Sequence, residues 1–476
     1  MFRLIDLGSP FAIFFLLLQL ISPVKANEAI CLANLPGAID DVKEREEWER
    51  SHFGILVETL EEDQTLYSHN SQQYFIPASN AKLFTTTAIL AELGANYRIR
   101  TPIKVIGEAP NIEKLYIVTK GDPSLVTADL DQVVHELKAQ GVQQVNELVV
   151  ENAYFPNPAI VSSWEWADLK AFYGVGASSA ILNENTFGLT LLSQDEGEPI
   201  KLAWNDHPAA RQWRFENTAM TAPPETPYGI RINRDLGEPV LKISGEMSSD
   251  QGESTWGLAV RDPGYYFLET LRVSLLREGI QVQKGRVTTT PEAPNTEFSL
   301  IESPPLIDLV KKANLESNNL YAESLLRTLG KEANDTSPIQ ARENSLTALG
   351  VDSDSYALED GSGLSRHNLA SPSAIVQVLQ SIADTPVAEI FRETLPVSGE
   401  SGTLKHRFQE TVATGRVQAK TGTMSGISVL SGYVEPLGVE TLTFSILLNQ
   451  SEQPIAQQRE AIDEMVNLLA QVKECE

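Results

Sequence analysis

The sequence has two cysteines, one close to each end. Cys31 lies near the N-terminus and Cys475 is the penultimate residue. In an oxidising compartment such a pair can form a disulfide. That bond requires both chain ends to meet in one domain, as they would if a long insertion separated the two parts of that domain. The alternative is two unpaired thiols. With no further cysteine, a disulfide-rich scaffold and a thiolate zinc cluster are excluded.

The first 26 residues have the features of a secretory signal peptide. Arg3 supplies a positive charge, and residues 11–21 are apolar except for Gln19. In Val24-Lys25-Ala26, Val24 and Ala26 place small residues at the positions that a signal peptidase reads. A transmembrane anchor is the alternative, but about 11 apolar residues fall short of the ~20 that span a bilayer. We therefore expect cleavage after Ala26, export to the periplasm or cell envelope, and no stable membrane anchor.

Length and charge narrow the class of protein further. A chain of 476 residues has room for about three domains. Its net charge of −27 disfavours contact with phosphate backbones, so we expect no nucleic-acid partner. The six histidines show no pairing at metal-ligand spacing, so no metal and no cofactor is expected.

Hydrophobic periodicity predicts alternating helical and strand-rich regions. A helix is expected from Pro77 to Gly94, and turn-rich residues 188–262 indicate a small β unit. The other expected helices are 264–279, 305–330, 371–384 and 456–472, and the expected strands are 53–60, 65–68, 101–106, 114–119, 416–421, 427–434 and 441–448.

The first of three short motifs is Ser79-Asn80-Ala81-Lys82, at the start of the helix after Pro77. Its three-residue offset puts Ser79 and Lys82 on one helical face. Serine is a weak nucleophile that needs a nearby base, and a desolvated lysine can be that base. The alternative is an N-terminal serine beside a solvated lysine.

The second motif is Ser317-Asn318-Asn319, a polar stretch between apolar helical runs. A hydroxyl and an amide two residues apart can relay a proton and hold a substrate carbonyl, although a helix cap or turn would use the same residue types.

The third motif is Lys420-Thr421-Gly422-Thr423, at the end of a strand-like run. Lysine beside a hydroxyl suits a substrate carboxylate, and glycine lets a substrate lie against the strand edge. An edge-strand lysine followed by a turn glycine is the alternative.

Together, in this order, the three motifs are the signature of penicillin-binding proteins and serine β-lactamases. The sequence resembles the D-alanyl-D-alanine carboxypeptidase/endopeptidase family, the class C low-molecular-mass penicillin-binding proteins, over nearly the whole mature chain. The segment 360–366 (DGSGLSR) is its most specific support. Further support comes from 77–82, 121–125, 173–185 (YGVGASSAILNEN) and 395–404 (LPVSGESGTL).

The resemblance implies an α/β (α+β) catalytic domain of the penicillin-recognising serine transpeptidase/β-lactamase type. Two mainly β or mixed domains are inserted between the first and second motifs. We expect the catalytic domain at 27–98 and 299–476, inserted domain II at 99–187 and 263–298, and inserted domain III at 188–262. This arrangement would bring both chain ends into the catalytic domain.

By resemblance, Ser79 attacks the penultimate D-alanine carbonyl of a peptidoglycan stem peptide while Lys82 takes its proton. Ser317 and Lys420 carry the proton toward the leaving amine. Asn319 binds the substrate amide, and the third motif supplies the remaining contacts. These are the carboxylate contacts of Lys420 and Thr421, the open strand edge at Gly422, and an oxyanion hole of the Ser79 and Thr423 N–H groups.

The resemblance also implies acylation of Ser79 by β-lactams and slow release of the adduct. Arg366 is expected either to line the cleft or to form a structural ion pair. Glu151 lies where relatives carry an acidic residue facing the amino group of the third stem residue.

Two other functions are weighed. A serine β-lactamase shares the fold and the nucleophile, but the large insertion and a serine rather than a tyrosine at position 317 argue against the class C type. A non-catalytic peptidoglycan-binding protein has no need of Ser79 and Lys82. The sequence leaves open the oligomeric state, including a homo-oligomer, and the balance of carboxypeptidase and endopeptidase activity.

Overall fold

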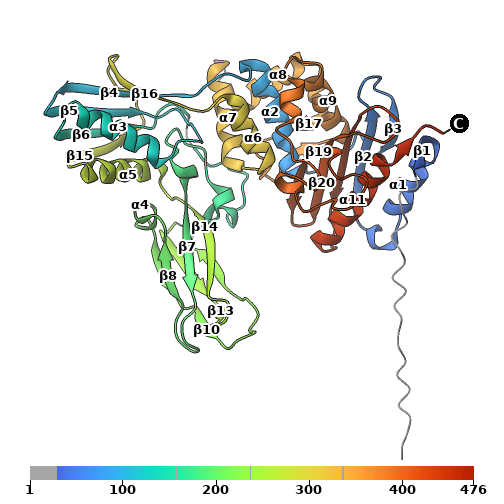
Figure 1. Ribbon diagram of the computed structural model, residues 1–476, viewed down its shortest axis with the longest axis horizontal. Coiled ribbons are helices and arrows are strands. Elements are labelled where there is room, and N and C mark those ends of the chain that lie inside the picture. The colour runs from blue at the N-terminus through green and yellow to red at the C-terminus, as the bar shows by residue number, and fades with distance from the viewer. Residues whose placement is uncertain (1–28, 157, 236, 335–336, 476) are drawn as a thin grey trace, which may run out of the picture.

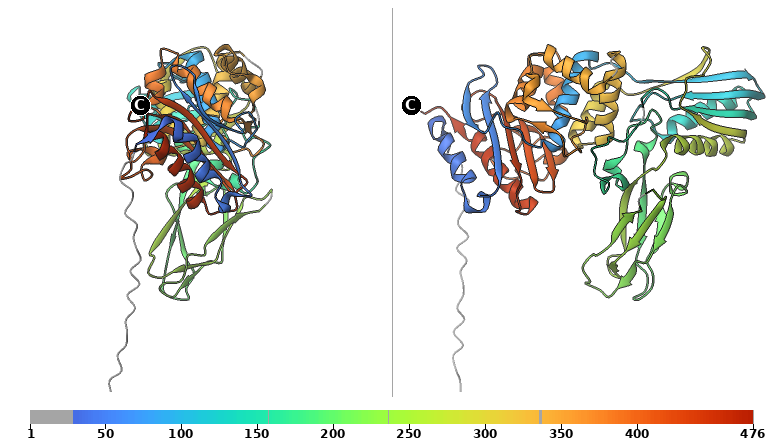
Figure 2. Two further views of the ribbon diagram at one scale, coloured as in Figure 1. Left: turned by 90° about the vertical axis from the view of Figure 1, so that its right-hand side faces the viewer. Right: turned by 180° about the vertical axis from the view of Figure 1, so that it is seen from behind.

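The computed structural model describes residues 29–156, 158–235, 237–334 and 337–475 (Figure 1). The predicted signal peptide, residues 1–26, lies outside this part of the chain. Over the described ranges, no helix combines the length and apolar character needed to cross a membrane. The molecule is elongated, with one sheet-and-helix body at each end and a small β unit projecting to one side (Figures 1 and 2).

The first body is built on a five-stranded antiparallel sheet. Its order is β19 (Val417–Met424), β20 (Ile427–Val434), β21 (Leu442–Asn449), β2 (His52–Thr59) and β3 (Thr65–His69). These strands match the predicted ones within a few residues. Strands β20 and β21 are buried along their whole length because helices cover both faces.

Alternate residues of β21 enter different cores, as the two-residue period of a strand requires. Ile446 and Leu448 pack with α1 (Leu35–Lys43) and α11 (Ile455–Ala470) on one face. Leu447 packs on the other face with the helical layer. That layer comprises α2 (Ala81–Leu93), α6 (Leu306–Leu315), α7 (Asn319–Glu332), α8 (Pro338–Ala348), α9 (Pro372–Ala383) and α10 (Ala388–Arg392).

Helix α2 is the centre of this layer, and every residue from Ala81 to Leu90 is buried. It ends at Gly94, whose φ of +73° suits glycine. The predicted helical region 305–330 is divided into α6 and α7. Ser317 has φ +58°, and the Asn318 side chain caps α7 by accepting a hydrogen bond from the Tyr321 N–H group.

The second body has a mixed sheet in the order β15-β6-β5-β4-β16. Helices α3 (Thr127–Ala139) and α5 (Pro263–Arg277) share its core. The strand bounds are Arg100–Glu108 (β4), Asn111–Val118 (β5), Gln144–Glu151 (β6), Gln281–Thr288 (β15) and Glu297–Glu302 (β16). Strand β16 crosses the boundary predicted between residues 298 and 299, because it pairs with β4 as far as Glu302.

The predicted small β unit consists of three short sheets. Their strands are β7 (Thr186–Leu192), β8 (Lys201–Trp204), β9 (Arg214–Asn217), β10 (Met220–Ala222), β11 (Arg231–Arg234), β12 (Val240–Ser244), β13 (Glu246–Ser248) and β14 (Glu253–Ala259), with the short helix α4 (His207–Ala210). The unit continues at both ends into the second body, through the segment before β7 and through α5 (Figure 1).

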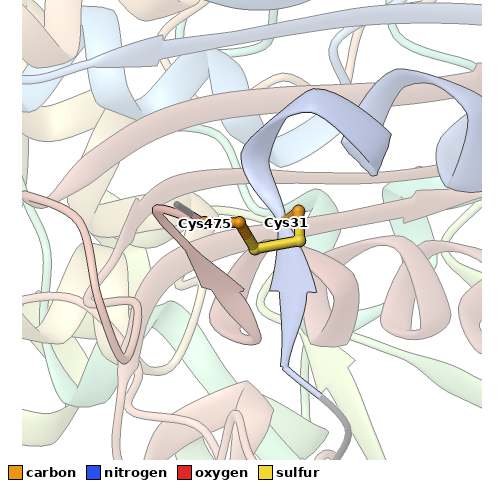
Figure 3. Close-up of a disulfide and its surroundings, with 2 residues drawn as sticks. All are labelled: Cys31 and Cys475. Atoms are coloured by element: carbon orange, nitrogen blue, oxygen red, sulfur yellow. A yellow bond between two sulfur atoms is a disulfide. The ribbon is translucent and has the colours of Figure 1, made fainter.

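The first and last described segments of the chain lie together in the first body. Strand β1 (Ile30–Cys31) pairs in parallel with β22 (Val472–Lys473). Beside this pair, Cys31 and Cys475 form a disulfide that joins residues 444 positions apart (Figure 3). A further two-stranded pair, β17 (Tyr356–Ala357) with β18 (Leu369–Ala370), flanks the segment 358–368.

Candidate active site

The three sequence motifs meet where the helical layer touches edge strand β19. Ser79 lies in a 3₁₀ turn (Ala78–Asn80) that leads into α2, and Lys82 lies in the first turn of that helix. Ser317 occupies the break between α6 and α7, and Lys420 lies on β19. Residues from distant parts of the chain thus share one site.

The side chain of Lys82 is fully buried and has three oxygen neighbours. Its Nζ lies 3.0 Å from Ser79 Oγ, 2.7 Å from Asn319 Oδ1 and 2.6 Å from the Ser362 carbonyl oxygen. The amide oxygen of Asn319 and the carbonyl oxygen of Ser362 can only accept hydrogen bonds, so they fix two N–H groups of the lysine. A neutral Lys82 then has its lone pair free to face the Ser79 hydroxyl.

Lys420 is equally buried and forms the second half of the polar cluster. Its Nζ lies 2.9 Å from Ser317 Oγ and donates to the Thr421 carbonyl oxygen at 2.8 Å. Burial, together with the nearby charge of Lys82, lowers the pKa of Lys420 well below its ordinary value. Burial also lowers the pKa of Lys82 to about 7, against the opposing influence of Asp360 and Glu323. Lys82 is therefore suited to accepting and passing on a proton near neutral pH.

Two glycines allow the backbone to close around Ser79. A Cβ atom on Gly422 would lie 2.9 Å from the Ser79 nitrogen, so a side chain there would crowd the N–H group of the nucleophile. Gly363 has φ +84°, and a Cβ atom there would overlap the Ala78 carbonyl oxygen. Ala78 itself has φ +45°, an unfavourable value for a residue with a side chain.

A cleft of about 460 Å³ opens above this cluster. Of the residues singled out from the sequence, Ser79, Ser317, Asn319, Thr423 and Arg366 line it. The structure does not bring Thr421 and Gly422 into the lining. Thr421 donates its hydroxyl to Thr403 Oγ1 at 2.7 Å, and Gly422 packs behind the nucleophile.

Arg366 combines the two roles that were considered for it. It lines the cleft, and its Nε forms an ion pair with Glu165 at 3.1 Å. The hypothesis about Glu151 is wrong. This residue ends β6 in the second body, is buried, and uses its carboxylate to accept hydrogen bonds from the Glu292 and Ala293 N–H groups.

The carboxylates that line the cleft are instead Glu165, Asp168 and Glu316. Two of them belong to the segment 160–174, named here the wall segment, which also contributes the exposed rings of Phe172 and Tyr173. Burial raises the pKa of Asp168. No local sequence pattern marks Glu165, Asp168 and Phe172, because the wall segment is irregular and shows no hydrophobic period.

Two further neighbours of the third motif were also missed. Thr403 contacts Thr421, and it belongs to the 395–404 segment that supports the family resemblance. Arg459 on α11 donates to Thr423 Oγ1 at 3.2 Å. Within the described ranges, no group of three or more His, Cys, Asp or Glu side chains has the geometry to hold a metal ion.

Known proteins resemble the chain over most of its length. Residues 35–472 match the model of the D-Ala-D-Ala carboxypeptidase 3 (S13) family. A D-alanyl-D-alanine carboxypeptidase of Actinomadura sp. (strain R39) is 32% identical over 452 residues, which cover 89% of this chain and 82% of the relative.

Two solved structures are similar in fold. Penicillin binding protein 4 from Haemophilus influenzae gives a TM-score of 0.80 at 24% identity and covers 90% of this chain and 98% of its own. A predatory peptidoglycan endopeptidase from Bdellovibrio bacteriovorus gives 0.53 at 16% identity, with 88% and 92% covered. These likenesses confirm the predicted fold class, a catalytic α/β domain carrying inserted domains.

Proposed function

The chain belongs to the D-Ala-D-Ala carboxypeptidase 3 (S13) family, and we propose that it hydrolyses D-alanyl-D-alanine through an acyl-enzyme on Ser79. The observation that carries this proposal is the position of Lys82 Nζ, 3.0 Å from Ser79 Oγ and held by two oxygens that only accept hydrogen bonds. A buried lysine held in this way is a base directed at one hydroxyl.

In the acylation step, Ser79 Oγ attacks the carbonyl carbon of the penultimate D-alanine and its proton passes to Lys82 Nζ. The negative charge that develops on the carbonyl oxygen is stabilised by the N–H groups of Ser79 and Thr423. Removal of one such donor costs about 3–4 kcal/mol of barrier. The close approach of Gly422 to the Ser79 nitrogen supports this pairing, since it brings the end of β19 against the nucleophile.

Expulsion of the leaving D-alanine requires a proton on its nitrogen. Lys82 gives up the proton it took from Ser79, and Ser317 with Lys420, whose Oγ and Nζ lie 2.9 Å apart, pass it to this nitrogen. We assign the terminal carboxylate of the substrate to Lys420 and to Thr421, whose hydroxyl exchanges its bond to Thr403 for one to the carboxylate. Asn319 binds the substrate amide. Water then attacks the ester on Ser79 and releases the shortened peptide.

We assign endopeptidase activity to the same acyl-enzyme, with the amine of a cross-linked stem peptide as the leaving group. The carboxylates Glu165 and Asp168 support recognition of a third stem residue that carries an amino group, such as diaminopimelate. A peptidoglycan endopeptidase with the same fold is consistent with this assignment.

β-Lactams acylate Ser79 in this account, because their strained amide reacts with the same nucleophile and leaves no departing amine. The H. influenzae protein with the same fold has been solved in complex with a β-lactam.

For the chain as a whole we propose export to the periplasm or cell envelope. We propose a catalytic domain of residues 27–98 and about 304–476, with domain II (99–187 and 263 to about 303) and domain III (188–262) inserted. The pairing of β16 with β4 as far as Glu302 supports an end of domain II later than the expected residue 298.

The test uses the purified mature protein with two substrates. One is a stem pentapeptide ending in D-Ala-D-Ala, and the other is a cross-linked dimer of stem peptides. Release of D-alanine from the first and of monomers from the second, both lost in Ser79→Ala, is expected. Failure to release D-alanine from the pentapeptide would contradict the proposed carboxypeptidase activity. A dimer that stays intact would contradict the proposed endopeptidase activity.

A further inference from the structure

Helix α7 carries a buried acidic residue, Glu323, close to the site. It belongs to none of the three motifs and does not line the cleft. The carboxylate of Glu323 is 2% exposed. It follows Asn319 by four residues, so the two side chains lie on one face of the helix. A carboxylate buried so deeply requires hydrogen-bond donors to offset its lost hydration.

The donors come from the turn at the start of the 360–366 segment (DGSGLSR), which also contacts Lys82. Glu323 Oε1 accepts hydrogen bonds from the Gly361 N–H group at 2.9 Å and from the Ser362 N–H group at 2.8 Å. The carbonyl of the same Ser362 accepts from Lys82 Nζ at 2.6 Å. One residue therefore separates the Glu323 carboxylate from the proposed base.

The turn is pressed directly against α7. A Cβ atom on Gly361 would lie 2.8 Å from the Ala322 carbonyl oxygen, so the lack of a side chain lets the turn reach the helix. On its other side, the Gly361 carbonyl accepts from Thr85 Oγ1 on α2 at 2.9 Å. The turn thus bridges the helix that carries the base and the helix that carries Glu323.

We propose that Glu323 is a positioning residue for Lys82, acting through the Ser362 carbonyl. Helix α7 then supplies both oxygens that fix the lysine: Asn319 Oδ1 directly, and Ser362 O by means of the Glu323 carboxylate. This inference rests on the proposed role of Lys82 as the base.

The role proposed for Glu323 depends on its oxygen and not on its charge. Four charged groups face it: Asp360 in the turn, Arg327 on α7, Arg342 on α8 and Lys82 on α2. Burial and Asp360 raise the pKa of Glu323 to about 7, so the group is mostly neutral below pH 7. In either form its oxygen accepts the Gly361 and Ser362 N–H groups, and this acceptor is what a variant can test.

The experiment measures the second-order rate constant of acylation by a fluorescent penicillin between pH 5 and 9. Glu323→Gln keeps an oxygen that can accept both N–H groups but removes the charge. Glu323→Ala removes the acceptor as well. Glu332→Gln, an exposed change on the same helix, is the matched control.

For Glu323→Gln, which keeps the acceptor, we expect acylation within about threefold of the wild type at every pH, because the wild-type carboxyl is itself mostly neutral below pH 7. Glu323→Ala should be acylated at least about tenfold more slowly at every pH, and the Glu332→Gln profile should coincide with that of the wild type. A Glu323→Ala rate close to that of the wild type overturns the proposal, as does a Glu323→Gln rate as low as that of Glu323→Ala. If Glu323→Ala does not fold, Glu323→Asp, which shortens the side chain by one methylene, takes its place with the same expectation. Failure of the wild type to be labelled at Ser79 would instead reject the proposed function.

Discussion

The side-chain nitrogen of Asn319 donates a hydrogen bond to the backbone carbonyl of Tyr173, 2.9 Å away. The oxygen of the same amide lies 2.7 Å from Lys82 Nζ. One side chain of the second motif therefore joins the proposed base to the wall segment. A second link, from Trp164 Nε1 to Asp360 Oδ2 at 2.9 Å, ties the wall segment to the DGSGLSR turn.

On its other side, the wall segment is held by the small β unit. The guanidinium of Arg234 on β11 lies 4.7 Å from the ring centroid of Trp166 and 5.2 Å from that of Trp213. Phe172 packs against Gly257 of β14, where a Cβ atom would come within 3.1 Å of the ring. The small β unit thus supports the side of the cleft that carries Asp168.

We therefore expect Arg234→Ala to weaken recognition of extended peptides. Loss of the contacts with two tryptophans, each about 0.5–2 kcal/mol, should raise KM about tenfold for a stem peptide with a diamino acid at position three. Acylation by a small β-lactam, which does not reach the wall segment, should change less than twofold. Arg231→Ala, an exposed change on the same strand, is the control. An unchanged KM in Arg234→Ala would show that the contacts of Arg234 do not hold the wall segment in place for the substrate.

The pKa of Lys82 predicts how acylation depends on pH. Burial lowers this pKa to about 7, so the lysine is mostly protonated below pH 7 and mostly neutral above it. Because only the neutral form can take the Ser79 proton, the acylation rate should fall about tenfold per pH unit below 7 and level off above it. Stopped-flow labelling across this range measures the profile, and a rate independent of pH from 5 to 8 would exclude Lys82 as the base.

The disulfide predicts a contribution to stability. Cys31 and Cys475 close a loop of 444 residues, and a bond across so long a loop restricts the unfolded chain. Replacement of both cysteines by serine should lower the free energy of unfolding by about 2–5 kcal/mol. Urea unfolding of the oxidised wild type and the double variant gives the difference, with a thiol assay to verify oxidation. Equal midpoints would mean that β1 and β22 hold the chain ends together without the bond.

Local sequence patterns predicted the elements on which the residues of the three motifs lie. The three-residue offset of Ser79 and Lys82 puts both on one turn, a polar break in a helical pattern marks Ser317, and an edge strand carries Lys420. Each of these features depends on neighbours within a few residues. The sequence also predicted strands β2, β3, β20 and β21, and the apolar runs of β20 and β21 match a sheet covered on both faces.

Contacts between distant segments could not be predicted in this way. Strand β6 pairs in parallel with β15, which follows it by more than a hundred residues, and no local pattern specifies that partner. The wall segment acquires its role from the bond between Asn319 and Tyr173, 146 positions apart. In the sequence Glu323 is an ordinary helix residue. Only the structure shows that its carboxylate accepts a hydrogen bond from the Ser362 N–H group.

The central claim is that Ser79 forms the covalent intermediate. Incubation of the purified protein with a penicillin, followed by intact mass and peptide mapping, tests it most directly. The account predicts a slowly released adduct on the peptide that contains Ser79, absent from Ser79→Ala, which should otherwise fold normally since one small substitution rarely unfolds a domain. An adduct that persists in Ser79→Ala would contradict the claim, as would the absence of any adduct in the wild type, and rapid turnover of the penicillin would indicate a β-lactamase instead.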